Sequence, residues 1–229
     1  ALGVGAIFYW RVVVKNRRMK KSVQTANDES AAKSAILHNM SSQMEPTLDQ
    51  LDQNDPAVRN LRGYVQRVGE LSDVGSSAPA EEEALEEVNL QPYCDAIANK
   101  IRPMLRPRVI LNLDGCKGYA RIDAPEVEKI LTHLLENAAK HTPEGGKITL
   151  AYRKRGAKSH QFIVTDTSPG IPENERENLF KPFAIPTDIS KGARLGLPIC
   201  ALRAEKINGS LTLDTTVTTG ASFSLALHS

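Results

Sequence analysis

Two apolar stripes at helical spacing, separated by a short turn, constrain the fold of this chain more than any other feature. In the first segment the apolar residues recur every three or four positions and so share one helix face: Leu37, Met40, Met44, Leu48 and Leu51. Asn54-Asp55-Pro56 interrupts the pattern, and Pro56 suits the first turn of a second helix. The same spacing then continues through Val58, Leu61, Val65, Val68 and Leu71. The sequence therefore predicts an antiparallel helical hairpin over residues 16–74.

A two-helix hairpin cannot bury both of its stripes by itself. Hairpins of this kind usually pair with a second copy, which produces a four-helix bundle. We therefore expect the chain to form a homodimer through residues 16–74.

The residues after the hairpin have a different composition and pattern. Residues 75–87, which begin with Gly75-Ser76-Ser77-Ala78-Pro79 and continue into an acidic run, are predicted to be a linker. Beyond them, residues 88–229 mix helical and strand patterns. We expect helices over 91–104, from Asp123 onwards and over 197–207, and strands over 109–113, 148–152, 162–165, 211–215 and 222–227. The predicted fold class is α+β: the hairpin is followed by an α/β sandwich with helices on one face of a mixed sheet.

The first residues of the chain resemble the end of a membrane-spanning helix. Residues 1–10 are almost wholly apolar and end in Phe8-Tyr9-Trp10, and a cluster of cations follows. Ten residues are too few to span a bilayer, which needs about 20, and a signal peptide would carry its cations before the apolar stretch. We expect residues 1–15 to be the end of a transmembrane helix and its juxtamembrane segment. A buried or disordered N-terminus is the alternative.

A polar face on the helix that Asp123 opens carries possible nucleotide chemistry. His133, Asn137 and Lys140 are four and three positions apart and lie on one side of the helix. A carboxamide oxygen can bind Mg²⁺, and an ammonium group can meet phosphate. By itself, such a face is more often simply solvated.

Two later segments add to this pattern. Asp166 directly follows a predicted buried strand and precedes a turn with Gly170, where its carboxylate could accept a hydrogen bond from a purine amine. Gly192 and Gly196 precede a helix, where backbone N–H groups can approach phosphate. Each segment alone is also consistent with an ordinary turn.

Together and in this order, these segments resemble the nucleotide-binding boxes of the histidine kinase, gyrase and heat-shock chaperone ATPase superfamily. Leu-Leu-Glu-Asn-Ala-Ala-Lys-His-Thr at 134–142 is similar to its Asn box, and residues 164–172 and 192–197 are similar to its two Gly boxes. Leu-Phe-Lys-Pro-Phe at 179–183 is similar to its Phe box, and residues 219–223 to its closing strand motif. With the hairpin, the chain resembles a bacterial sensor histidine kinase.

The resemblance implies ATP and Mg²⁺ as cofactors and assigns roles to individual residues. Asn137 would bind Mg²⁺, Lys140 would meet phosphate, and Asp166 would bind the adenine amine. Gly170 would give the base room, and residues 181–194 would form a lid. Gly192, Gly196 and Leu197 would lie along the phosphates. Ser222, in the closing strand motif, is the remaining residue implied at the site.

Several positions depart from the family pattern. His133 stands where the kinases usually have Asn and the ATPases a water-activating Glu, and His141 replaces the usual aromatic residue beside adenine. Ser168 and Arg194 each replace a usual Gly.

The hairpin contains the largest departure. Asn-Met-Ser-Ser-Gln-Met-Glu-Pro-Thr-Leu at 39–48 resembles the family's phosphoacceptor box, with Ser42 at the acceptor His position and Gln43 at the adjacent Glu. A serine hydroxyl needs an activating base, and glutamine cannot accept a proton. Pro46 stands where phosphatase-competent members carry Thr or Asn. His38, one helical turn earlier, is a possible displaced acceptor, and phosphorylation of Ser42 itself is a further alternative.

The resemblance implies a two-component signalling protein of the bacterial inner membrane, with this region in the cytoplasm. It would form a homodimer, act on a response regulator protein and transfer a phosphoryl group from ATP, and we expect no nucleic-acid partner. One alternative is a pseudokinase that works as a nucleotide-responsive switch. Another is an ATPase of the same superfamily without transfer, in which His133 positions water.

Overall fold

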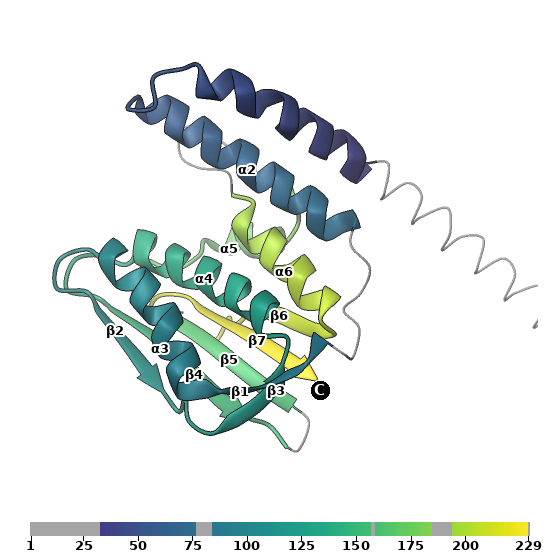
Figure 1. The fold of residues 1–229 in the computed structure, drawn as a ribbon. Helices are drawn as coiled ribbons and strands as arrows, with labels where there is room; N and C mark the ends of the chain where they lie inside the picture. Colours follow the sequence, from purple (N-terminus) through teal and green to yellow (C-terminus); the bar gives the residue numbers. More distant parts are fainter. Residues whose placement is uncertain (1–32, 77–83, 157–158, 185–193, 229) are drawn as a thin grey trace, which may run out of the picture.

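The computed structural model describes residues 33–76, 84–156, 159–184 and 194–228. Its N-terminal part consists of two antiparallel helices, one covering residues 33–49 and the other, α2, spanning Pro56–Ser76 (Figure 1). The turn between them is closed by Asp55, whose carboxylate accepts a hydrogen bond from the backbone N–H of Ala57 at 2.8 Å. Hydrogen bonds from Arg62 to Asp49 and from Ser72 to the Ser34 carbonyl join the two helices. The predicted helical hairpin is confirmed over residues 33–74, and the rest of its predicted range, residues 16–32, lies outside the described residues.

The second part is a mixed sheet with helices on one face. Its strands are β2 (Ile110–Asp114), β4 (Lys147–Lys154), β5 (Ser159–Asp166), β6 (Gly209–Leu213) and β7 (Ser222–His228), in the order β2-β4-β5-β7-β6. β2 pairs with β4 in parallel, and the other pairs are antiparallel. The helices α3 (Leu90–Ile101), α4 (Ala124–His141) and α6 (Gly196–Lys206) cover one face (Figure 1). The α+β fold is confirmed.

The core lies between α4 and the sheet. Ile130, Leu131 and Leu134 from α4 are fully buried, as are Leu150 on β4 and Phe162 on β5. Asp123 caps α4, because its side chain accepts a hydrogen bond from the backbone N–H of Glu126 at 3.1 Å. This cap fixes where α4 begins and therefore which of its residues point away from the core.

Three elements differ from the sequence-based expectation. α3 ends at Ile101 and a 3₁₀ turn, Arg102–Met104, follows it, because Pro103 has no N–H to continue the α-helix. The range 75–87, expected as a linker, overlaps α2 at Gly75 and Ser76 and β1 (Glu86–Asn89) at its other end. β1 pairs with β3 (Tyr119–Ile122) in a separate two-stranded sheet. The side chains of β1 are mostly exposed, so no apolar alternation indicated this strand.

The hairpin packs onto the sandwich through α2 and α6. Val68, Leu71 and Val74 form an apolar cluster with Leu195 and Ile199 at the start of α6. This cluster, called the α2–α6 cluster below, brings α2 close to the sequence-predicted nucleotide site.

Residues 1–15, predicted to be the end of a transmembrane helix, lie outside the described residues. Within the described ranges, none of the helices combines the length and the apolar character needed to cross a membrane.

Candidate nucleotide-binding site

A single cavity of about 840 Å³ brings most of the sequence-predicted nucleotide residues together. It lies between α4, the turn after β5, the start of β7 and the start of α6. The predicted residues that line it are Asn137, Lys140, His141, Asp166, Gly170, Gly196 and Leu197. Its size is within the usual range for small-molecule sites, roughly 300–1,000 Å³.

Asp166 is buried at the end of β5 and is held by the backbone. Its Oδ1 accepts hydrogen bonds from the N–H groups of Ser168 at 2.8 Å and Ala221 at 3.2 Å. The backbone N–H of Asp166 donates to the Ala221 carbonyl at 2.9 Å. Because Oδ1 is occupied in this way, Oδ2 is the oxygen through which Asp166 can accept a hydrogen bond from a ligand in the cavity.

The turn after β5 packs tightly against the turn before β7. Gly170 has a φ of +82°, and a Cβ built there would lie 2.8 Å from the Gly220 carbonyl oxygen. A Cβ at Gly220 would lie 1.9 Å from the Asp166 carbonyl oxygen. Ser168, at a usual Gly position, fits because its Oγ accepts a hydrogen bond from the Gly170 N–H at 3.2 Å. Only glycine allows this approach of the two turns, which keeps the cavity open beside Asp166.

The cavity also has apolar lining residues, which suit a flat aromatic ring. Ile171, Leu179, Leu197 and Phe223 line it. His141 lies at the same cavity, and its pKa is lowered, first because burial removes water from the ring and second because Lys140 is nearby. A neutral imidazole can stack on a base, so the replacement of the usual aromatic residue by His141 is compatible with this site.

Other residues that line the cavity are polar or positively charged. Asn137 and Lys140 lie one helical turn apart on α4, and Arg194 pairs with Glu175 at 2.9 Å. Among the described residues no group of three or more His, Cys, Asp or Glu side chains could hold a metal ion. Mg²⁺ at Asn137 would therefore need phosphate and water oxygens as its other ligands, which is its usual environment in nucleotide sites.

His133 and Ser222, predicted as site residues, do not line the cavity. His133 faces α2, where its Nε2 lies 3.5 Å from Glu70 Oε2. Burial, together with the charges of Arg67 and Arg203, lowers the pKa of His133 to about 3. The ring is therefore neutral near pH 7. The predicted role of His133 in catalysis stays a prediction; here its ring contacts α2 and does not line the cavity.

Ser222 is buried in the sheet, where its Oγ lies 3.0 Å from Thr165 Oγ1. It acts on the site only through its neighbours Ala221 and Phe223, which line the cavity. Gly192, the remaining residue predicted for the phosphates, lies outside the described residues.

The two acceptor candidates are also away from the cavity. Ser42 is exposed on the helix over residues 33–49. His38 is exposed as well, and its Nδ1 lies 3.5 Å from Asp73 Oδ1 on α2. Neither side chain lines the cavity, so transfer to this helix would require the hairpin and the sandwich to move relative to each other.

Sequence reasoning missed the contribution of α2 to the site. Arg67 on α2 lines the cavity, and its Nη2 lies 3.2 Å from Oε2 of Glu136, another lining residue. The only sequence signal was a cation on the second helix next to the apolar stripe, and that is common on solvated helices.

Known proteins match this chain in sequence and in fold. Residues 122–229 match the family model described as histidine kinase-, DNA gyrase B- and HSP90-like ATPase. An adaptive-response sensory kinase SasA from Nostoc is 36% identical over 107 residues, which are 46% of this chain and 27% of that protein. The catalytic domain of histidine kinase ThkA has 25% identity and a TM-score of 0.51 over 63% of this chain and 96% of its own. Full-length ShkA in complex with AMPPNP has 22% identity and a TM-score of 0.62 over 90% of this chain and 45% of its own.

Residues 122–229 thus form an ATPase domain of this superfamily, and they contain most of the cavity. The chain is therefore similar to sensory kinases over this domain, and its fold is that of a histidine kinase catalytic domain. The chain spans 36% and 27% of the lengths of two SasA relatives that it matches.

Proposed function

We propose that this protein binds ATP with Mg²⁺ in the cavity and works as a dimeric signalling protein of a two-component system, with a response regulator as its partner. The observation that carries the proposal is the arrangement of the cavity. Its lining combines a carboxylate fixed by the backbone and several apolar side chains with a carboxamide and several cations.

Each part of ATP has a complementary group in this arrangement. Oδ2 of Asp166 would accept a hydrogen bond from the adenine amine, and the apolar lining residues would contact the adenine ring. Lys140 and the first N–H groups of α6 would meet the phosphates. Asn137 would contribute an oxygen to Mg²⁺, which supplies charge neutralisation at the phosphates when bound.

Two forms of this function differ in whether the γ-phosphoryl group leaves ATP. A kinase would transfer it to protein, mainly through positioning and electrostatics. A pseudokinase would use nucleotide binding alone as a switch. Ser42 and Gln43 favour the second form, because the acceptor position lacks both the imidazole and the adjacent carboxylate base. A water-activating ATPase has less support, because His133 does not line the cavity and its Nε2 lies 3.5 Å from Glu70 Oε2.

The predicted membrane anchor at residues 1–15 and the inner-membrane location belong to the same proposal. Their support is the sequence pattern alone, an apolar segment that ends in aromatic residues and is followed by cations.

Calorimetric titration of ATP in the presence of Mg²⁺ tests the proposed site. Asp166→Asn should weaken binding roughly tenfold or more, because losing a hydrogen bond at a buried polar group costs about 1–3 kcal/mol. Asp214→Asn is a matched control: this aspartate caps the exposed turn after β6, away from the cavity. We expect the control to bind ATP like the wild type. Absence of binding by the wild-type protein at millimolar ATP would refute the proposal.

A further inference from the structure

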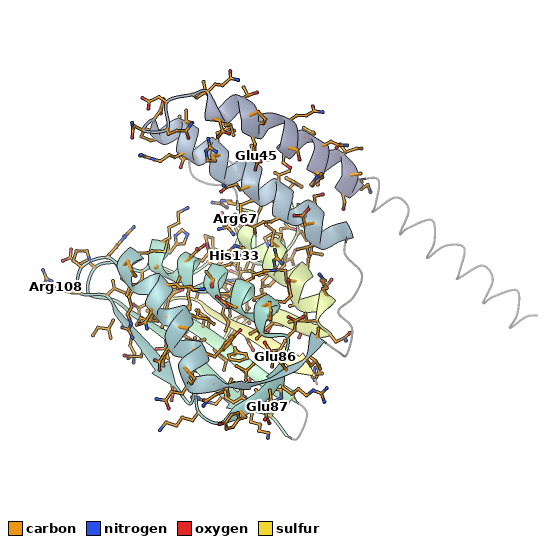
Figure 2. All side chains as sticks on the ribbon, in the orientation of Figure 1. Glu45, Arg67, Glu86, Glu87, Arg108 and His133 are labelled. Atoms are coloured by element: carbon orange, nitrogen blue, oxygen red, sulfur yellow. The ribbon has the colours of Figure 1, made fainter. Side chains whose placement is uncertain are left out.

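Arg67 belongs to the hairpin but reaches into the nucleotide cavity of the sandwich. It precedes Val68 of the α2–α6 cluster, so packing of α2 on α6 determines where its side chain lies. Figure 2 shows Arg67 and His133 in the space between α2 and the helices of the sandwich. One side of the guanidinium is held by Glu136, whose Oε2 lies 3.2 Å from Nη2.

The other side of this guanidinium lacks a partner. Within the described residues Nη1 of Arg67 is buried and makes no hydrogen bond. It lies close to Gly196, the first residue of α6, because a Cβ built on Gly196 would be 3.7 Å from Nη1. A charged donor without an acceptor is costly, and because Arg67 lines the cavity, a small shift of its side chain would bring this donor to an anionic oxygen of a ligand.

The surrounding charges indicate which ligand would supply that oxygen. Lys140 and Arg194 also line the cavity, and Glu175 neutralises Arg194 at 2.9 Å while Glu136 neutralises part of Arg67. The N-terminus of α6 adds a partial positive charge at Gly196. A guanidinium with one side occupied can still present N–H groups of its other side to a phosphate oxygen.

We propose that Arg67 is a phosphate-binding residue supplied by the hairpin, with its guanidinium donating a hydrogen bond to a phosphate oxygen of the bound nucleotide. The inference rests on the proposed ATP site and adds that the site is complete only when α2 is docked on α6. Phosphate binding and hairpin docking then stabilise each other, since both depend on the position of Arg67.

The test compares a ligand that carries phosphates with one that does not. Affinities for ATP·Mg²⁺ and for adenosine are measured by calorimetry for the wild type and for Arg67→Ala. We expect ATP binding to weaken by roughly tenfold to a hundredfold, the usual effect of losing a hydrogen bond between charged groups. Adenosine binding should stay unchanged, because Arg67→Ala does not alter Asp166 or the apolar lining residues.

Arg62→Ala is the matched control. Arg62 lies on the same helix and also forms an ion pair, with Asp49 at 2.8 Å, but it does not line the cavity. Arg62→Ala should leave the affinities for ATP·Mg²⁺ and for adenosine unchanged. An Arg67→Ala protein that binds ATP as tightly as the wild type would overturn the role of Arg67 while leaving the ATP site in place. Equal weakening for ATP and adenosine would also overturn it, because that pattern indicates a structural role. A wild type that binds neither ligand would instead refute the proposed function itself.

Discussion

His133 and Glu70 face each other between α4 and α2, and the neutral state of His133 gives this contact a pH dependence. The pKa of the folded imidazole is about 3, because the ring is buried and because Arg67 on α2 and Arg203 on α6 add positive charge. In the unfolded chain the ordinary value is about 6.5. As the pH falls below about 6.5, the unfolded state takes up a proton that the folded state does not, and the folded state loses stability down to about pH 3.

We therefore expect the free energy of unfolding to decrease more steeply with falling pH in the wild type than in His133→Asn. Between pH 7 and pH 5 the extra loss should reach about 2 kcal/mol, since each pH unit below the unfolded pKa is worth about 1.4 kcal/mol per group. Urea unfolding at several pH values measures it. The other histidines remain in the variant, so they cancel in the difference. Parallel pH curves for the two proteins would contradict the burial of His133 beside α2.

Residues of the candidate site differed in how well the sequence predicted them. Asn137, Lys140 and Asp166 could be predicted because each lies in a local pattern, a helix face or a strand end, whose geometry follows from the sequence around it. The orientation of His133 and the presence of Arg67 could not, because both depend on a contact between α2 and α4 that joins residues far apart in the sequence.

Among the secondary-structure elements, α2 connects the two parts of the molecule. Leu71 on α2 is buried in the α2–α6 cluster, whereas Leu51, near the hairpin turn, is 46% exposed. Leu71→Ala should lower the free energy of unfolding by about 2 kcal/mol or more, because it leaves a cavity in an apolar contact. Leu51→Ala should change it by about 0.5 kcal/mol or less. Denaturant unfolding of the two variants tests this. Equal decreases in their free energies of unfolding would mean that α2 does not dock on α6.

Elements with strong periodicity were predicted from the sequence, and exposed ones were not. α4 was predicted because its apolar stripe and its Asp123 cap both mark the helix. β1 and β3 were missed, because their small sheet leaves many of its side chains in solvent and their pairing joins distant segments. The hairpin was predicted from its spacing, but its contact with α6 required knowledge of tertiary packing.

At the scale of the whole molecule, the hairpin leaves an apolar surface uncovered within one chain. Ile36, Met40 and Met44 recur at four-residue spacing on the first helix and are 59%, 54% and 38% exposed. A second copy of the chain would cover this stripe in the proposed dimer. Replacing Met40 and Met44 with Glu should give a monomer in light scattering, because like charges would then face each other across the bundle.

The control for this prediction is Glu45→Lys. Glu45 is exposed and, from helix geometry, lies on a different side of the helix from the stripe, so its reversal should leave the dimer intact. A double Met variant that stays dimeric would place the interface elsewhere.

The central claim is that the ATP site is intact while the acceptor helix lacks its acceptor. Incubation with γ-labelled ATP tests both halves at once, using the wild type, Ser42→His with Gln43→Glu, and His38→Ala. We predict little or no acid-labile label on the wild type, because Ser42 has no base beside it and His38 lies about 6 Å along the helix from the usual position. Label should appear in the restored double variant. Acid-labile label on the wild type that disappears only in His38→Ala would contradict the account and would identify His38 as the acceptor.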